Sequence, residues 1–155
     1  MLQIGIAGVG RLGRFHAGKI LSDPRCALAG VYDIDPVRNQ EVARDFGVKA
    51  FGSYAELLAA CDAMDIVATT SAHYELAKTA LHAGKPVFVE KPLCAELRQA
   101  EEVVELADKL GLSIQVGHIE RFNPVILAAE RHISSPLFIE STRISSFRPR
   151  GTDVS

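Results

Sequence analysis

The chain has 155 residues, of which 48% are hydrophobic and 23% are charged, and its formal net charge is −2 at pH 7. These values are typical of a globular protein with one domain and a little more, and they exclude a basic footprint for nucleic acid or a polybasic membrane patch. Cys26, Cys61 and Cys94 lack the spacing of a zinc site or a disulfide framework, so we expect no metal. No apolar run is long enough to span a membrane, and a strand pattern begins almost at Met1, which predicts a cytoplasmic protein.

The first 33 residues carry the most specific pattern of the chain. An apolar run over residues 2–7 leads into Gly8-Val9-Gly10-Arg11-Leu12-Gly13, a helix is expected over 14–21, and a second apolar run over 27–32 ends at Asp33. Strand, glycine-rich turn, helix and strand, with an acidic residue 20 positions after the last glycine, form the dinucleotide-binding fingerprint. A GxGxxG on its own is weak evidence, but the flanking strands and the acid make nucleotide binding the prediction.

Each glycine of the turn has an expected task in binding a cofactor. Gly8 permits the tight turn, Gly10 lets the backbone approach a pyrophosphate, and Gly13 lets the helix pack closely on the strand. The unpaired N–H groups that open the following helix favour a phosphate, and Arg11 and Leu12 of the turn are expected among the cofactor-binding residues.

Asp33 predicts which dinucleotide is bound. Its carboxylate can accept two hydrogen bonds from the ribose diol of NAD, whereas it would repel the 2′-phosphate of NADP. We therefore expect NAD as the cofactor, with NADP less favoured.

The chain then alternates between helix and strand patterns up to residue 118. Expected in order are a helix over 36–46 capped by Asp35, a strand over 48–51, a helix opened by the capping box at 53–56, a strand over 64–68, a helix over 73–81, a strand over 87–89, a helix over 97–110 and a strand over 113–116. This alternation predicts an α/β fold, a doubly wound parallel six-stranded Rossmann sheet ordered 3-2-1-4-5-6, as a dinucleotide-binding domain over 1–118.

The pattern changes after residue 118. A short helix is expected from Asn123-Pro124 to about residue 131, and residues 136–147 alternate like an antiparallel strand. Because a lone apolar strand exposes an unpaired edge, we interpret 119–155 as the connecting helix and first strand of a truncated α+β second domain.

Polar residues follow several strands, at the edge where open α/β sheets bind their ligands. Lys91 can hydrogen-bond a reacting hydroxyl and stabilise alkoxide charge beside a nicotinamide, or it is a surface lysine in a turn. Glu90 bonds the cofactor ribose, fixes Lys91 or is a plain ion-pair partner. The backbone and hydroxyl groups of Thr69 and Thr70 either lie alongside the nicotinamide-side ribose or simply cap the next helix.

Four stretches together resemble the Gfo/Idh/MocA family of oxidoreductases. They are the glycine turn with Phe15-His16-Ala17, the run 69–74, Glu90-Lys91-Pro92, and Gly117-His118 with Arg121-Phe122-Asn123-Pro124. The resemblance implies an NAD(P)-dependent oxidation or reduction of a sugar or cyclitol hydroxyl carbon. The form of residues 121–124 is most similar to members that act on nucleotide-activated amino sugars.

The resemblance also suggests roles for three further residues. His73 resembles the family's cofactor-side histidine, with a satisfied structural histidine as the alternative. His118 and Arg121 face the expected substrate region, where Arg121 binds a phosphate or carboxylate or pairs with Glu120. Lys91 is the expected catalytic residue and touches both cofactor and substrate.

One departure from the family concerns its proton acceptor. Relatives carry an Asp-x-x-x-His pair in the second domain, whereas this sequence ends at Ser155 before such a pair. We therefore expect the cofactor half of a sugar dehydrogenase, inactive as it stands and a homo-oligomer when full length. The alternatives are a non-catalytic NAD-binding or redox-sensing module, and a methyltransferase, against which the GxGxxG spacing and Glu90-Lys91-Pro92 argue.

Overall fold

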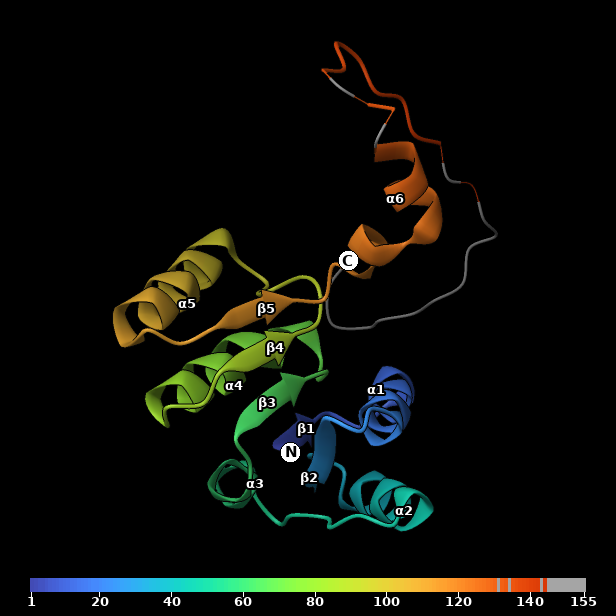
Figure 1. Cartoon of the computed structure of the whole chain (residues 1–155). Coiled ribbons are helices and arrows are strands. Elements are labelled where there is room, and N and C mark those ends of the chain that lie inside the picture. Colours follow the sequence, from blue (N-terminus) through green and yellow to red (C-terminus); the bar gives the residue numbers. More distant parts are fainter. Residues whose placement is uncertain (131, 134, 143, 145–155) are drawn as a thin grey trace.

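A computed structural model describes residues 1–130, 132–133, 135–142 and 144, and it contains a five-stranded parallel sheet (Figure 1). The sheet order is β2-β1-β3-β4-β5, with every neighbouring pair parallel. The strands are β1 (Leu2–Ala7), β2 (Cys26–Tyr32), β3 (Ala63–Ile66), β4 (Val87–Val89) and β5 (Ile114–Val116).

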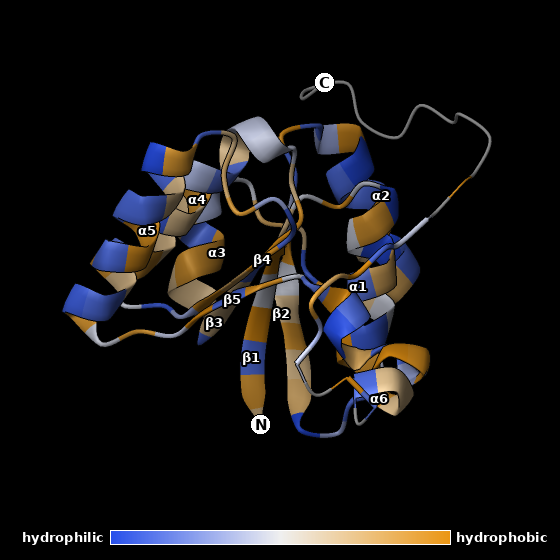
Figure 2. Ribbon diagram, turned by 90° about the horizontal axis from the view of Figure 1, so that it is seen from above, coloured by the Kyte–Doolittle hydropathy of each residue, from blue (hydrophilic) through white to orange (hydrophobic). Residues whose placement is uncertain are grey.

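Helices cover both faces of the sheet, as a doubly wound fold requires. Figures 1 and 2 show α1 (Arg11–Ser22) and α2 (Pro36–Phe46) on one face, and α3 (Tyr54–Ala60), α4 (Thr70–His82) and α5 (Leu97–Leu110) on the other. The short 3₁₀ helix η1 (Ile119–Phe122) and α6 (Pro124–Glu130) follow β5. The predicted α/β Rossmann architecture is confirmed.

Two apolar cores lie on the two sides of the sheet. The larger core packs the β3 and β4 side chains against α3, α4 and α5, and includes Leu57, Ile66 and Leu81. The smaller one packs β1 and β2 against α1 and α2, around Ile6 and Val42. Because both faces of the sheet are covered, the strands carry apolar runs with little alternation. The outer side of α5, which faces away from the sheet, is hydrophilic (Figure 2).

The sheet has five strands, so the prediction of six is wrong. The segment over 48–51 forms a single parallel bridge, between Ala50 and Val31. The Val31 N–H donates to the Lys49 carbonyl and the Phe51 N–H donates to the Val31 carbonyl, each at 2.9 Å. The segment therefore lies beside β2, where the expected order places it. It is not a strand because it is bounded by Gly47, in the left-handed conformation, and by a bend at Gly52.

The capping residues predicted for α2 and α3 are found in the structure, whereas the predicted starts of α1 and α4 are shifted. Asp35 accepts hydrogen bonds from two N–H groups that open α2, and Ser53 does the same for one N–H of α3. The helices α1 and α4 begin at Arg11 and Thr70, three residues earlier than predicted in each case. The first turn of α1 contains Gly13 and that of α4 contains Thr70 and Ser71, so the apolar period becomes visible only one turn later.

The antiparallel strand predicted over 136–147 is not formed where the structure describes it. Residues 136–142 and 144 have no strand conformation, while 143 and 145–147 lie outside the described residues. A strand needs a neighbour for its backbone N–H and carbonyl groups, and the described part of this region contains no second sheet. The second domain over 119–155 is thus not shown, and the boundary at residue 118 stays a prediction.

Candidate functional site

The glycine turn lies between the end of β1 and the start of α1, and its three glycines have different surroundings. Gly8 has φ +91°, and a Cβ there would lie 2.4 Å from the Ala68 nitrogen. A Cβ on Gly13 would lie 2.1 Å from the Gly8 carbonyl oxygen. A Cβ on Gly10 would meet nothing within 4 Å. Gly8 and Gly13 are therefore required by packing, while the space above Gly10 is open, as close approach to a pyrophosphate requires.

The N-terminus of α1 faces this opening without a side-chain cap. Gly10 is the N-cap, and the first turn contains no acidic residue that would neutralise the helix dipole. The N–H groups of Arg11 and Leu12 therefore remain available, at the end of the helix that favours an anion. The turn fits the phosphates of a dinucleotide.

Asp33 follows β2 and is bound to the glycine turn. Its Oδ2 accepts a hydrogen bond from the Val9 N–H (2.8 Å), and its Oδ1 accepts one from the Asp35 N–H (2.9 Å). The Arg38 guanidinium lies 3.2 Å from Oδ1, while the Asp33 side chain is only 6% exposed. A carboxylate has about four acceptor positions, so these contacts leave capacity for a ribose hydroxyl. The contact with Val9 adds a structural task that the sequence did not indicate.

Lys91 follows β4 on the same edge of the sheet. Its side chain is exposed, and its amino group forms no hydrogen bond or ion pair within the part of the chain that the structure describes. Its N–H donates to Oε2 of Glu90 at 3.1 Å, and the Lys91–Pro92 peptide bond is cis. Glu90 is buried, and its recorded contact with Lys91 joins its carboxylate to the backbone N–H of that residue and not to the ammonium.

The sequence analysis missed a buried cluster of charged residues. It consists of His16, Asp65 and Glu90, and we call it the His16 cluster. His16 Nδ1 lies 2.9 Å from Asp65 Oδ2, and Nε2 lies 3.4 Å from Glu90 Oε1. Burial acts to lower the pKa of His16, but the two carboxylates outweigh it and raise that pKa. Burial raises the pKa of Asp65 against the opposing effect of His16. A signal was available, since a carboxylate within a buried apolar strand requires a partner.

His73 is buried and joins two loops of the site. Its Nδ1 lies 2.9 Å from the Pro92 carbonyl oxygen, and its Nε2 lies 3.0 Å from that of Ala68. Both ring nitrogens thus face main-chain groups, which supports the structural alternative for His73. Thr69 is the exposed N-cap of α4 and makes no side-chain cap bond, whereas Thr70 is buried in the first turn. Contact of these three residues with a cofactor stays a prediction.

His118 and Arg121 lie on the segment that follows β5. His118 precedes η1 and donates its N–H to the Val116 carbonyl oxygen at 2.7 Å, and Arg121 lies within η1. Both side chains are exposed. The structure records no contact of theirs with Lys91 among the described residues, and their role in substrate binding stays a prediction.

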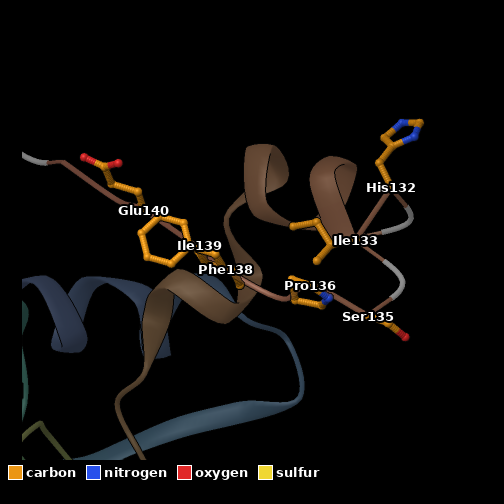
Figure 3. A pocket seen from close by; sticks show the side chains of 7 residues that line it. All are labelled: His132, Ile133, Ser135, Pro136, Phe138, Ile139 and Glu140. Carbon is orange, nitrogen blue, oxygen red and sulfur yellow. The ribbon is translucent and has the colours of Figure 1, made fainter.

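A hollow of about 520 Å³ lies near the end of the described chain, away from the glycine turn in the sequence (Figure 3). Its polar side chains, His132, Ser135 and Glu140, point away from one another, so no convergent group of ligands results. Over the described ranges, no cluster of three or more His, Cys, Asp or Glu side chains is arranged for a metal, and no helix is long and apolar enough to cross a membrane. The edge around the glycine turn is the candidate site.

Comparison with known proteins gives the family. The family model for Gfo/Idh/MocA oxidoreductases, described as an oxidoreductase family with an NAD-binding Rossmann fold, matches residues 2–118. The chain belongs to the Gfo/Idh/MocA family. This assignment confirms the resemblance in the sequence and removes the methyltransferase alternative.

Curated dehydrogenases align with most of this chain. UDP-N-acetylglucosamine 3-dehydrogenase of Acidithiobacillus ferrooxidans is 36% identical over 154 residues, which are 99% of this chain and 49% of the relative. The scyllo-inositol 2-dehydrogenase (NAD(+)) of Bacillus subtilis is 33% identical over 138 residues, covering 86% of this chain and 40% of the relative. The chain therefore spans about half the length of these relatives, or less.

Solved structures of similar proteins have the same fold. UDP-N-acetylglucosamine 3-dehydrogenase from Acidithiobacillus ferrooxidans superposes with a TM-score of 0.81 at 37% identity, covering 84% of this chain and 43% of that one. The crystal structure of GenD2 from gentamicin A biosynthesis, in complex with NAD, has a TM-score of 0.82 at 26% identity, covering 86% and 39%. NAD is thus bound by a homologue of the same fold.

Proposed function

We propose that the protein is an NAD-dependent dehydrogenase that acts on a hydroxyl carbon of a sugar or nucleotide sugar, and that the described residues form its cofactor-binding part. One observation carries the proposal. The ammonium of Lys91, which has no recorded partner among the described residues, lies at the same strand edge as an open, uncapped phosphate-binding turn. A cation at the ligand-binding edge of the sheet can stabilise negative charge that develops on a substrate oxygen, which supports an enzyme over a purely binding module.

The cofactor is held by main-chain groups and one carboxylate. The N–H groups after Gly10 bind the pyrophosphate, and Asp33 accepts from the adenosine ribose with its remaining capacity. Thr69, the N-cap residue of α4 whose side chain makes no cap bond, lies along the path to the nicotinamide end. NAD supplies the acceptor for the hydride that leaves the substrate carbon.

Lys91 acts on the oxygen of the substrate. Its ammonium donates a hydrogen bond to the reacting oxygen and stabilises the negative charge that develops as the hydroxyl proton passes to the Asp-x-x-x-His acceptor that relatives carry in their second domain. Glu90 supports the lysine in this proposal, since that carboxylate is buried and accepts the Lys91 N–H. The bond from Glu90 fixes the backbone from which the lysine side chain extends.

A nucleotide-activated amino sugar is the substrate class that we propose. The 36% identity to a UDP-N-acetylglucosamine 3-dehydrogenase supports it, as does the run Arg121-Phe122-Asn123-Pro124. In this proposal Arg121 binds the diphosphate and His118 lines the sugar pocket, both exposed after β5. A homo-oligomer is proposed by analogy with the family.

Turnover tests the function directly. The protein expressed from its complete reading frame is expected to produce NADH from NAD and UDP-N-acetylglucosamine or a related nucleotide sugar, followed by absorbance at 340 nm. Inositol and glucose 6-phosphate serve as comparison substrates. Tight binding of NAD without turnover of any of these would favour the redox-sensing alternative instead.

Cofactor choice gives a separate prediction. NAD is expected to bind about 10-fold more tightly than NADP, or about 1.4 kcal/mol, because the 2′-phosphate would approach the buried Asp33 carboxylate. Isothermal titration of both cofactors measures it, and Asp33→Asn is expected to narrow the difference. Equal affinities would show that Arg38, 3.2 Å from Asp33, governs this end of the pocket.

A further inference from the structure

We propose that His16 is a positioning residue that holds the Glu90 carboxylate, and through it the backbone of Lys91, in the geometry that catalysis requires. Its effect on turnover rests on the dehydrogenase function proposed above, whereas the contact itself does not. His16 lies on α1, Asp65 on β3 and Glu90 at the end of β4, so the cluster joins three elements of the fold.

The charges of the His16 cluster explain why the histidine is needed. Asp65 and Glu90 are both buried, with 7% of each residue exposed, and the His16 ring lies between them. Asp65 Oδ1 has no hydrogen-bond partner, so His16 is the recorded side-chain partner of that carboxylate within the described residues. Two carboxylates on a poorly solvated face repel each other, and a cation between them offsets both desolvation and repulsion.

Glu90 passes this geometry on to Lys91. Its Oε1 faces His16, while its Oε2 accepts the Lys91 N–H at 3.1 Å. Gly117 closes the other side, since a Cβ there would lie 2.6 Å from Oε1. With one side blocked by backbone, the histidine and the Lys91 N–H determine the rotamer of Glu90.

Protonation of His16 is what completes the arrangement. The imidazolium carries an N–H on both nitrogens and donates to both carboxylates. After deprotonation the shorter contact, with Asp65, keeps the remaining N–H, so a lone pair on Nε2 faces Glu90 Oε1 and the contact becomes repulsive. The charged groups that face the ring are Asp65 and Glu90, and the Phe88 ring packs edge-on. Lys19 of the same helix lies with His16 on the wall of a cavity of about 550 Å³. Glu90 is therefore held at low pH and released as pH rises through the His16 pKa.

NMR titration of the 155-residue chain tests the contact without any substrate. In the wild type, the Lys91 amide resonance is expected to shift with the same midpoint as the His16 ring, above the ordinary histidine value of 6.5. This transition should be lost in His16→Asn and kept in His82→Asn, a matched exposed histidine on α4. Should His16→Asn fail to fold, Glu90→Gln gives a second measurement, in which the His16 midpoint should fall. A Lys91 amide that titrates unchanged without His16, or a His16 midpoint unmoved in Glu90→Gln, overturns the proposal.

Kinetics of the complete protein tests the consequence for turnover. His16→Asn is expected to lower kcat about tenfold with KM for NAD almost unchanged, since a small misplacement of the lysine reduces its stabilisation of the transition state. In a double-mutant cycle, His16→Asn should add little to Glu90→Gln, because the histidine acts through that carboxylate. Fully additive losses would show a merely structural histidine. If the complete protein turns over no sugar, the proposed function fails, while the NMR titration still decides the contact.

Discussion

Replacing Lys91 with alanine is expected to lower kcat by about 10²-fold or more, which is typical of losing a general acid–base or electrostatic group. The reason is the position of its ammonium, exposed and unpaired within the described structure at the edge that follows β4. The affinity for NAD should change little, because the phosphate-binding turn and Asp33 are untouched. Steady-state NADH production with nucleotide sugars, by the protein from its complete reading frame, measures this effect.

Lys109→Ala is the matched control for Lys91. This lysine is also exposed, but it lies in the last turn of α5, which leads into the amino end of β5 and not to the carboxyl edge of the sheet where the glycine turn lies. Its substitution should leave kcat and the affinity for NAD unchanged. An unimpaired Lys91→Ala enzyme would place the chemistry on another residue and refute the mechanism proposed for Lys91.

The glycine turn gives the second large effect, and it separates binding from folding. Gly10→Ala is expected to weaken NAD binding by about 10-fold or more, equivalent to about 1.4 kcal/mol, with no change in thermal stability. Gly10 has φ −63° and a Cβ there meets no atom of the protein, so alanine is accommodated in the free chain. The added methyl group occupies the space that the pyrophosphate needs.

Gly8→Ala is expected to act on folding instead. Its φ of +91° is unfavourable for alanine, and the Cβ would lie 2.4 Å from the Ala68 nitrogen. Strain of this kind costs about 2 kcal/mol or more, so the unfolding temperature should fall by several degrees. Isothermal titration with NAD and thermal unfolding by circular dichroism, on both variants, measure the two effects. Normal NAD affinity in Gly10→Ala would show that the cofactor does not approach this turn.

The local parts of the site could be predicted from the sequence. The Rossmann architecture, the structural tasks of Gly8 and Gly13 and the position of Lys91 after a strand follow from patterns within about 30 residues of chain. Such patterns reflect local requirements, such as a backbone with positive φ at Gly8, a capping carboxylate at Asp35 or an apolar run covered on both faces. These requirements act on neighbouring residues, so the sequence records them directly.

Pairing between distant segments was decided by the tertiary structure alone. His16 and Asp65 are 49 positions apart, and nothing local in either segment shows that α1 brings the ring between β3 and β4. The segment over 48–51 has a strand-like composition but forms only one bridge with β2, because the length of a ladder depends on how the chain enters and leaves it. The sequence by itself therefore determines the fold and the glycine turn. Only the tertiary structure decides which buried charges are in contact, because an ion pair needs only proximity and leaves no periodic pattern in the sequence.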